Sequence, residues 1–348
     1  MSAGTGRTAP RAGAAAPHRS PDVPVVASRR GHFWIPGDTV AVSTGTAQRG
    51  PMFVQWEAPE QLRHEVPLVL VHGGGGQGTD WLGALDGGPG WAQQFVAAGF
   101  AVYVVDRPGH GRSPYHPEVI GEMGAPFSYE AAVGLFAPPE RAGEQSAWAW
   151  GREPGDDGLD QLVAAFGPLP ADLGWSQELD ADRLARLLDR IGPAVLVTHS
   201  AGGPVGWLAA DRRPELVEAI VAVEPMGPAF VEFPGMGALE WGLTAAPVTY
   251  DPPLGSPQAV RAADPADRRI PGLAGTEVLV VTGGSSAFAD FADDVVTFLR
   301  DAGAPAERLH LPDEGVHGNG HGMLLEAGAD RACAPVVRWL AERDGRTI

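Results

Sequence analysis

Short apolar runs alternate with stretches in which apolar residues recur at helical spacing, and this pattern predicts the fold class. Runs rich in β-branched residues occupy 66–71, 101–105, 195–198, 216–223 and 278–281. Continuous apolar runs of this length are typical of strands that are buried on both faces. One stretch between them, LDADRLARLLDRI at 179–191, places its apolar residues as an amphipathic helix does. We therefore expect an α/β fold with a mainly parallel, twisted sheet and helices on both faces.

Two long insertions interrupt this pattern. Residues 114–178 are rich in Pro, Gly and Trp and contain scattered aromatic residues. Segments of this length between sheet elements usually carry function, so we expect a cap of short helices whose aromatic side chains form one wall of an apolar pocket. An equally good interpretation is that these side chains only attach the insertion to the core. Residues 226–275 are again rich in Gly and Pro and predict a second, looser insertion.

The N-terminal part of the chain has its own character. Residues 1–30 combine Ala, Gly, Pro, Arg and Ser with almost no large apolar residues, which predicts a disordered tail. Residues 31–348 are then expected to form one domain, because a chain of this length can fold around a single large core. Two short runs rich in β-formers, 38–42 and 52–56, predict an antiparallel hairpin at the edge of the sheet.

The composition disfavours several kinds of partner. A formal net charge of −18 makes nucleic acids and anionic membrane surfaces unfavourable partners. No apolar run approaches the roughly 18 residues of a membrane span, and no apolar core of a Sec signal peptide is visible. We therefore expect a cytoplasmic protein with no membrane span, and export stays open. The single cysteine, Cys333, leaves no internal disulfide, and its place in a late helical stretch predicts buried packing.

The strongest candidate for chemistry follows the apolar run at 195–198. The residues His199-Ser-Ala-Gly-Gly203 end the predicted strand, and a helix is expected to begin directly after them. A strand, a sharp turn that carries a serine, and a helix are the parts of a nucleophile elbow, where small residues flank the serine. Gly202 supplies one small neighbour of Ser200, whereas Thr198 stands where the usual pattern has glycine. A plain turn with a capping serine is the alternative interpretation.

A glycine run follows the strand predicted at 66–71. The run His72-Gly-Gly-Gly-Gly76 lacks the Lys-Ser/Thr pair of a phosphate-binding P-loop. Glycines allow backbone N–H groups to turn toward a developing negative oxygen, so we expect an oxyanion loop here. His72 itself is expected to brace that loop. A flexible linker is the alternative interpretation.

The order of the remaining candidates also predicts a catalytic triad. A serine nucleophile needs a base, and a histidine base needs a carboxylate that fixes its tautomer. Ser200 is followed by Glu224, at the end of a predicted strand, and by a late Gly-rich loop with His317 and His321. Serine, acid and histidine follow one another in this order in the α/β-hydrolase fold. Most families of that fold carry the acid after the strand after next, but here no acid occurs there before Asp290. Glu224 is therefore the expected acid, and Asp290 is the fallback.

From Pro67 to the C-terminus the chain resembles the bacterial Ser-His-Glu esterases of the α/β-hydrolase superfamily. The stretches that carry the resemblance are 71–73, Trp91, 103–107, 111–113, 198–202, 223–225 and 315–321. The most specific are Val223-Glu-Pro225 and Gly315-Val-His-Gly-Asn-Gly-His321. The resemblance implies an α/β-hydrolase fold with Ser200 as nucleophile, Glu224 as acid and His321 as base. It further implies oxyanion donors at the backbone N–H groups of Gly74 and Ala201, and it implies no metal or cofactor.

The expected substrate pocket depends on residues beside this triad. The residues alone do not decide whether His317 or His321 is the base, because both lie in one Gly-rich loop. The resemblance favours His321. His317 is then expected to shape the loop or line the pocket. His199 is expected to be structural, or to line the pocket, and Gly75 is expected to line it. Some relatives carry paired cysteines where this chain has Gly74 and Gly75, and glycine still permits the donor geometry.

These features predict a serine hydrolase that cleaves a carboxylic ester of a small, largely apolar substrate. A lactonase is the nearest variant, because a lactone is a cyclic ester. A lyase or a cofactor-free oxidoreductase that reuses the same triad is a second hypothesis, because fold does not determine function. A non-catalytic binding protein is the third. The expected partner is a small-molecule ester or lactone, and the sequence does not decide between a monomer and a homodimer.

Overall fold

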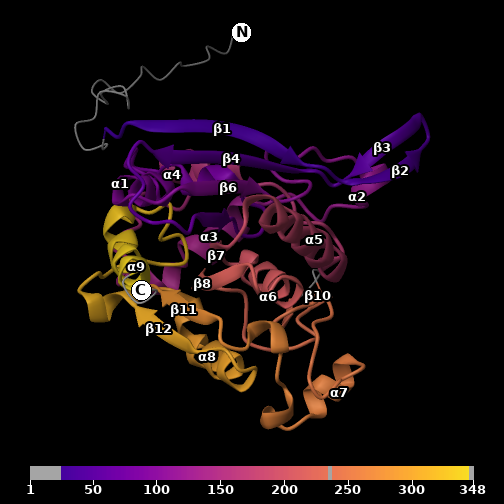
Figure 1. Cartoon of the computed structure of the whole chain (residues 1–348). Coiled ribbons are helices and arrows are strands. Elements are labelled where there is room, and N and C mark those ends of the chain that lie inside the picture. Colours follow the sequence, from indigo (N-terminus) through magenta and orange to yellow (C-terminus); the bar gives the residue numbers. More distant parts are fainter. Residues whose placement is uncertain (1–24, 234–236, 345–348) are drawn as a thin grey trace, which may run out of the picture.

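The computed structural model describes residues 25–233 and 237–344 and contains one central, mainly parallel sheet (Figure 1). Its eight strands follow one another across the sheet as β1 (Ser28–Ile35), β4 (Met52–Pro59), β6 (Val102–Asp106), β5 (Leu68–Val71), β7 (Ala194–His199), β8 (Val217–Val223), β11 (Glu277–Thr282) and β12 (Ala306–His310). The strands from β6 to β12 are parallel, whereas β1 and β4 pair antiparallel at one edge. The parallel strands therefore end at one common edge, where their connecting loops meet.

Helices cover both faces of the sheet, as the sequence predicts (Figure 1). One face packs against α5 (Leu173–Ile191), α6 (Gly202–Arg212) and α8 (Ala292–Asp301), and the other against α1 (Trp91–Ala98) and α9 (Ala329–Asp344). The strands supply alternate residues to the two cores: Leu196 and Ile220 face α5 and α6, whereas Val195 and Val221 face α1 and α9. Both residue sets are apolar because a parallel sheet is buried on both faces.

The first insertion forms a cap that is attached to the core. It contains α2 (Pro117–Ile120), α3 (Tyr129–Phe136), α4 (Asp157–Ala165) and the first turns of α5. Two of its segments run side by side, because the Gly124 N–H donates to the Leu169 carbonyl at 2.7 Å and the Ala171 N–H to the Glu122 carbonyl at 3.0 Å. We call residues 122–124 and 169–171 the strap. The second insertion holds α7 (Pro257–Ala262) and a short pairing of β9 (Glu232–Phe233) with β10 (Gly237–Ala238).

Two expectations for the N-terminal part are wrong. Residues 28–30 belong to strand β1 and not to a disordered tail; residues 1–24 of that expected tail lie outside the described residues. The expected pairing of 38–42 with 52–56 is also absent, because β2 (Asp38–Val42) pairs with β3 (Gly45–Arg49), and β4 pairs with β1 and β6. Backbone pairing holds the polar residues at 28–30 in the sheet, so apolar side chains are not needed there.

Within the described residues, none of the helices combines the length and hydrophobicity needed to cross a bilayer.

Candidate active site

Ser200 lies in a strained turn between β7 and α6. Its φ is +51°, in the left-handed region that residues with a side chain rarely adopt. The turn is tight enough that a Cβ on Gly202 would lie 2.8 Å from the His72 carbonyl oxygen. Glycine at this position is therefore required by contact with the preceding loop. The local geometry agrees with a nucleophile elbow, and Thr198 does not prevent it.

A continuous chain of polar contacts joins Ser200, His321 and Glu224. The Ser200 Oγ lies 3.0 Å from His321 Nε2, and His321 Nδ1 lies 3.2 Å from Glu224 Oε2. The three residues come from the ends of β7 and β8 and from the loop that follows β12, far apart in sequence. All three are buried. The structure thus brings together the three residues that the sequence analysis selects.

Glu224 is held in place by two donors from the loop after β11. The Gly283 N–H donates to its Oε1 at 2.7 Å, and the Ser286 hydroxyl donates to its Oε2. Glu224 also has a positive φ, +47°, which turns its side chain at the strand end. Burial raises the pKa of Glu224, and the hydrogen bonds from Ser286 and Gly283 act in the opposite direction and favour the ionised form. In most families of the expected fold, the loop after β11 carries the acid. Here this loop supplies the two donors to Glu224, which lies at the end of the neighbouring strand β8.

The His321 ring is enclosed by other rings. Phe288 stacks on it with ring centroids 3.8 Å apart, and the rings of His199 and Phe136 lie 4.8 Å and 5.4 Å away. His199 Nε2 also contacts the His321 carbonyl at 3.0 Å. Burial lowers the pKa of His321. The imidazole is therefore neutral near neutral pH and able to accept a proton.

A buried carboxylate that the sequence analysis does not select holds the loop of His321. Glu326 accepts the Gly320 N–H at 3.0 Å on each of its oxygens. Gln145, from the cap, donates to Glu326 Oε1 at 2.8 Å. The cap is thus connected directly to the loop that carries the histidine.

The two residues whose N–H groups are expected to bind an oxyanion, Gly74 and Ala201, lie beside Ser200. Among the described residues, neither the Gly74 N–H nor the Ala201 N–H has a hydrogen-bond acceptor. Both residues line the same cavity as Ser200. A Cβ on Gly73 would lie 3.1 Å from Ser200 Cβ. Residues 72–76, which we call the glycine loop, therefore pack directly on the turn that carries Ser200.

The cavity beside Ser200 is almost entirely apolar. Its volume is about 490 Å³. Among the residues that the structure describes, no charged side chain lines it; its walls are formed by Gly74, Gly75, Gly124, Ala125, Pro126, Phe127, Ala131, Leu135, Gly167, Pro168, Leu169, Pro170, Ala171, Ser200, Ala201, Met226, Phe233 and Phe288. Phe127 lines the cavity from the cap, as expected, whereas Trp148 and Trp150 pack with the hydrophobic core and are not among its lining residues. The two interpretations of the cap aromatics therefore each hold for part of the set.

Several predicted residues lie elsewhere. His317 lines a separate small cavity with Ser146, and His199 Nε2 contacts the His321 carbonyl. Neither is among the described residues that line the apolar cavity, which favours the structural roles that the sequence analysis left open for both. Gly75 does line it. Asp290 forms an exposed ion pair with Arg141 and does not contact His321. A Gly-rich loop can direct either histidine inward, so spacing alone does not separate them.

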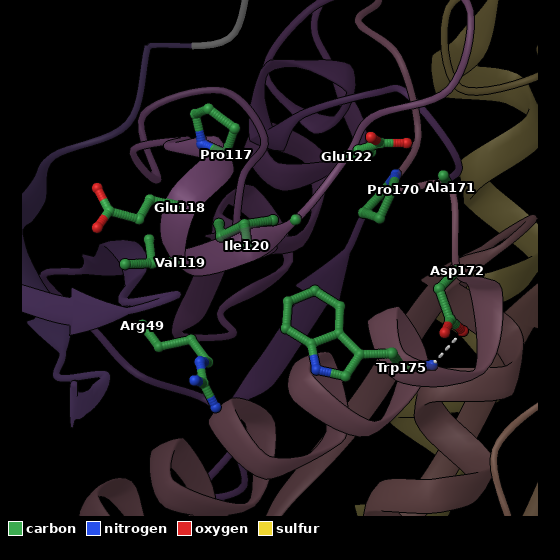
Figure 2. Close-up of a pocket in the computed structure, with 11 residues that line it drawn as sticks. Arg49, Pro117, Glu118, Val119, Ile120, Glu122, Pro170, Ala171, Asp172 and Trp175 are labelled. Carbon is green, nitrogen blue, oxygen red and sulfur yellow. Dashed lines mark hydrogen bonds between the residues drawn. The ribbon is translucent and has the colours of Figure 1, made fainter. Parts of the chain in front are cut away.

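A second cavity of about 560 Å³ lies beyond the strap, and its walls share Pro170 and Ala171 with the apolar cavity. Figure 2 shows its lining, where Asp172 accepts a hydrogen bond from the Trp175 N–H. The lining of this second cavity includes charged side chains such as Arg49, and it does not include Ser200, Gly74 or Ala201. The chemistry described above therefore belongs to the apolar cavity.

Residues 66–247 match the family model for the alpha/beta hydrolase fold. This match covers about half of the chain. The chain belongs to the α/β-hydrolase fold family. The family membership confirms the resemblance and the fold class inferred from the sequence.

Two relatives extend this comparison within the α/β-hydrolase fold family. A curated protein named "Probable secreted lipase phiG", from Fungal sp. (strain ATCC 74256), is 32% identical over 323 residues, which cover 86% of this chain and 88% of the relative. A solved structure described as a novel bacterial esterase has a TM-score of 0.70 at 22% identity and covers 93% of this chain and 98% of its own. The structural similarity to that esterase supports the fold over nearly the whole chain.

Proposed function

We propose that this protein is a serine hydrolase that cleaves carboxylic esters of small, largely apolar molecules. The observation that carries the proposal is the hydrogen-bonded chain from Ser200 through His321 to Glu224 at the wall of an apolar cavity. The names of the relatives, a probable secreted lipase and a bacterial esterase, support an ester as substrate. The absence of charged side chains among the residues that line the cavity favours an uncharged substrate.

In this mechanism Ser200 Oγ attacks the ester carbonyl while His321 Nε2 takes its proton. Glu224 stabilises the charged imidazole through Nδ1, and the N–H groups of Gly74 and Ala201 bind the oxyanion. The tetrahedral intermediate collapses with loss of the alcohol, to which His321 returns the proton, and an acyl-enzyme remains. A water molecule, deprotonated by His321, then releases the acid and restores Ser200.

The proposal is tested by intact mass measurement after incubation with a fluorophosphonate. We expect one adduct on the wild type, none on Ser200→Ala, and slow labelling of Glu224→Gln. His321→Ala should also fail to react, whereas its matched control His317→Ala should react like the wild type, because His317 lies outside the apolar cavity. Unimpaired labelling of Glu224→Gln would exclude it as the acid, and no labelling of the wild type would remove the proposal.

The class of substrate requires a second measurement on the same variants. Aliphatic p-nitrophenyl esters and lactones are compared, and an ester hydrolase releases the free acid with accumulation of an acyl-enzyme. A lactonase would instead open the ring as its preferred reaction. A lyase or a cofactor-free oxidoreductase would turn over without a trapped acyl-enzyme. The cellular location stays a prediction: the sequence indicates the cytoplasm, the fungal relative is named as secreted, and cell fractionation distinguishes the two.

A further inference from the structure

The peptide group between Gly73 and Gly74 is held from its carbonyl end by two buried side chains. Arg107 Nη2 donates to the Gly73 carbonyl oxygen at 2.8 Å, and His72 Nδ1 contacts the same oxygen at 2.8 Å. Arg107 and His72 are 3% and 0% exposed, so water does not compete for this carbonyl. Both lone pairs of the Gly73 carbonyl oxygen are therefore occupied.

The hydrogen bonds of His72 determine its tautomer. Its Nε2 accepts the Arg107 backbone N–H at 2.9 Å, so the ring proton must lie on Nδ1. Burial and the nearby Arg107 charge hold the pKa of His72 well below its usual value, so the ring is neutral. The Nδ1–H group then donates to Gly73, and the two contacts at the carbonyl are both true donors.

The opposite end of this peptide group is the expected oxyanion donor. The described cis peptide bonds are Gly227–Pro228 and Asp251–Pro252, so the Gly73–Gly74 bond is trans. In a trans peptide the C=O and the N–H point in opposite directions. Donors that hold the Gly73 carbonyl on one side therefore direct the Gly74 N–H to the opposite side, and Gly74 lines the same cavity as Ser200.

Arg107 is in turn held by a carboxylate. Its Nη1 lies 2.8 Å from Asp180 Oδ2, on helix α5, and the two side chains are 3% and 1% exposed. A guanidinium that is clamped between a carboxylate and a carbonyl has little freedom to rotate. Helix α5 thus fixes the glycine loop through one arginine.

We propose that Arg107, oriented by Asp180, is a positioning residue of the hydrolytic reaction: it fixes the Gly73 carbonyl and thereby directs the Gly74 N–H at the oxyanion. This inference rests on the proposed function. Glycines give the loop the freedom to approach Ser200, and the same freedom leaves the direction of each N–H undetermined. The buried arginine, together with the His72 Nδ1–H group on the same oxygen, removes that freedom before substrate binds. Arg107 acts on the oxyanion only through the peptide group.

The test compares kcat, KM and the affinity for an aliphatic trifluoromethyl ketone, whose serine adduct carries an oxyanion in the same place as the tetrahedral intermediate. The double variant Arg107→Met/Asp180→Leu removes both charges, so no unpaired charge is left buried. We expect kcat and the ketone affinity to fall in parallel by about 10²-fold, with KM for a neutral ester nearly unchanged. Arg107→Lys, which keeps one donor, should recover part of both losses.

Arg183→Met is the matched control. Arg183 is also a buried arginine, lies on the same helix as Asp180, and donates to the Gly50 carbonyl, away from the glycine loop. Its loss should lower stability and leave the kcat and ketone affinity of the folded fraction unchanged.

The outcomes separate this inference from the proposed function. A wild type that is neither active on esters nor inhibited by the ketone would overturn the proposed function itself. An active wild type whose Arg107 variants keep full ketone affinity would overturn the inference alone. Losses that follow only the folded fraction, as in the control, would reduce Arg107 to a structural role. If the double variant fails to fold, Arg107→Lys decides by the same two measurements.

Discussion

At the scale of single residues, the candidate site depends on two strained backbone positions on neighbouring strands. Ser200 and Glu224 have φ values of +51° and +47°, and each such position costs about 1–3 kcal/mol. Each is held by a backbone hydrogen bond to the last part of the next strand: the Ser200 N–H donates to Val223 at 3.0 Å, and the Glu224 N–H donates to Val281 at 2.9 Å. The hydrogen bonds to the sheet therefore maintain the strained backbone conformations that turn both side chains toward His321.

The hydroxyl of Ser286 gives a prediction at this scale. Because its hydrogen bond lowers the pKa of Glu224, Ser286→Ala should raise that pKa further. The proposed mechanism needs Glu224 ionised and His321 neutral, so the acid limb of the kcat/KM profile should move to higher pH. A hydrogen bond to a charged group corresponds to a shift of about one pH unit. The limb belongs to the coupled pair rather than to either residue.

The measurement is kcat/KM for a neutral ester across acidic, neutral and alkaline pH. Ser285→Ala is the control, because this neighbour makes no hydrogen bond to Glu224 among the described contacts. An unshifted acid limb in Ser286→Ala, or an equal shift in the control, would contradict the role of Ser286 in holding Glu224.

At the scale of elements, the sequence predicts local structure well where local chemistry decides it. Helix α1 ends at Ala98, because the glycine visible at position 99 adopts a left-handed φ of +105° at its C-terminal cap. Helix α5 begins at Leu173, six positions before the expected start, where the Asp172 side chain caps the Trp175 N–H. The pairing of β4 is not decided locally, because it depends on which strands, distant in sequence, lie beside β4 in the sheet. Residue patterns at 38–42 and 52–56 carry no information about that choice.

The same distinction applies to the candidate site. Chain order and strand ends select Ser200 and Glu224, because these features are local. The donors from Gly283 and Ser286 are not selected, although the run Gly-Gly-Ser-Ser after a strand end is visible in the sequence. Their role depends on β8 and β11 being neighbours in the sheet. The stacking of Phe288 on His321 likewise depends on tertiary contact alone.

The 3₁₀ turn Gly78–Trp81 gives a prediction about stability. It contains Asp80, a buried carboxylate whose pKa burial raises from 3.8 to about 8. The folded state therefore holds a proton that the unfolded state has lost between these two values, and stability falls as pH rises through that range. Asp80→Asn cannot ionise. It should gain stability relative to the wild type at high pH, on the order of a few kcal/mol.

Urea unfolding at about pH 5 and about pH 9 measures this difference. Asp294→Asn, which changes an exposed aspartate in α8, is the control for the general effect of removing a negative charge. The role of Asp80 is refuted if the stability difference between Asp80→Asn and the wild type is the same at both pH values.

At the scale of the whole molecule, charge and cavity chemistry favour the same substrates. The chain carries a formal net charge of −18, and the residues that line the apolar cavity supply no cationic side chain that would offset it locally. An anionic ester is therefore repelled during approach and is not compensated after entry. A neutral ester experiences neither effect. In the proposed reaction, the net charge thus disfavours anionic esters before any contact with Ser200.

This selection predicts a dependence on salt that distinguishes long-range repulsion from the local fit of the cavity. For an ester with a carboxylate on its acyl chain, kcat/KM should rise by about tenfold from low to physiological ionic strength, because counterions screen the field. For the uncharged ester of the same length, kcat/KM should stay nearly constant. The ratio of the two values, measured against sodium chloride, cancels any general effect of salt on the enzyme. If the ratio of kcat/KM for the anionic ester to that for the neutral ester is low and independent of salt, the cavity walls alone discriminate between them. A ratio near one would refute both long-range repulsion and discrimination by the cavity.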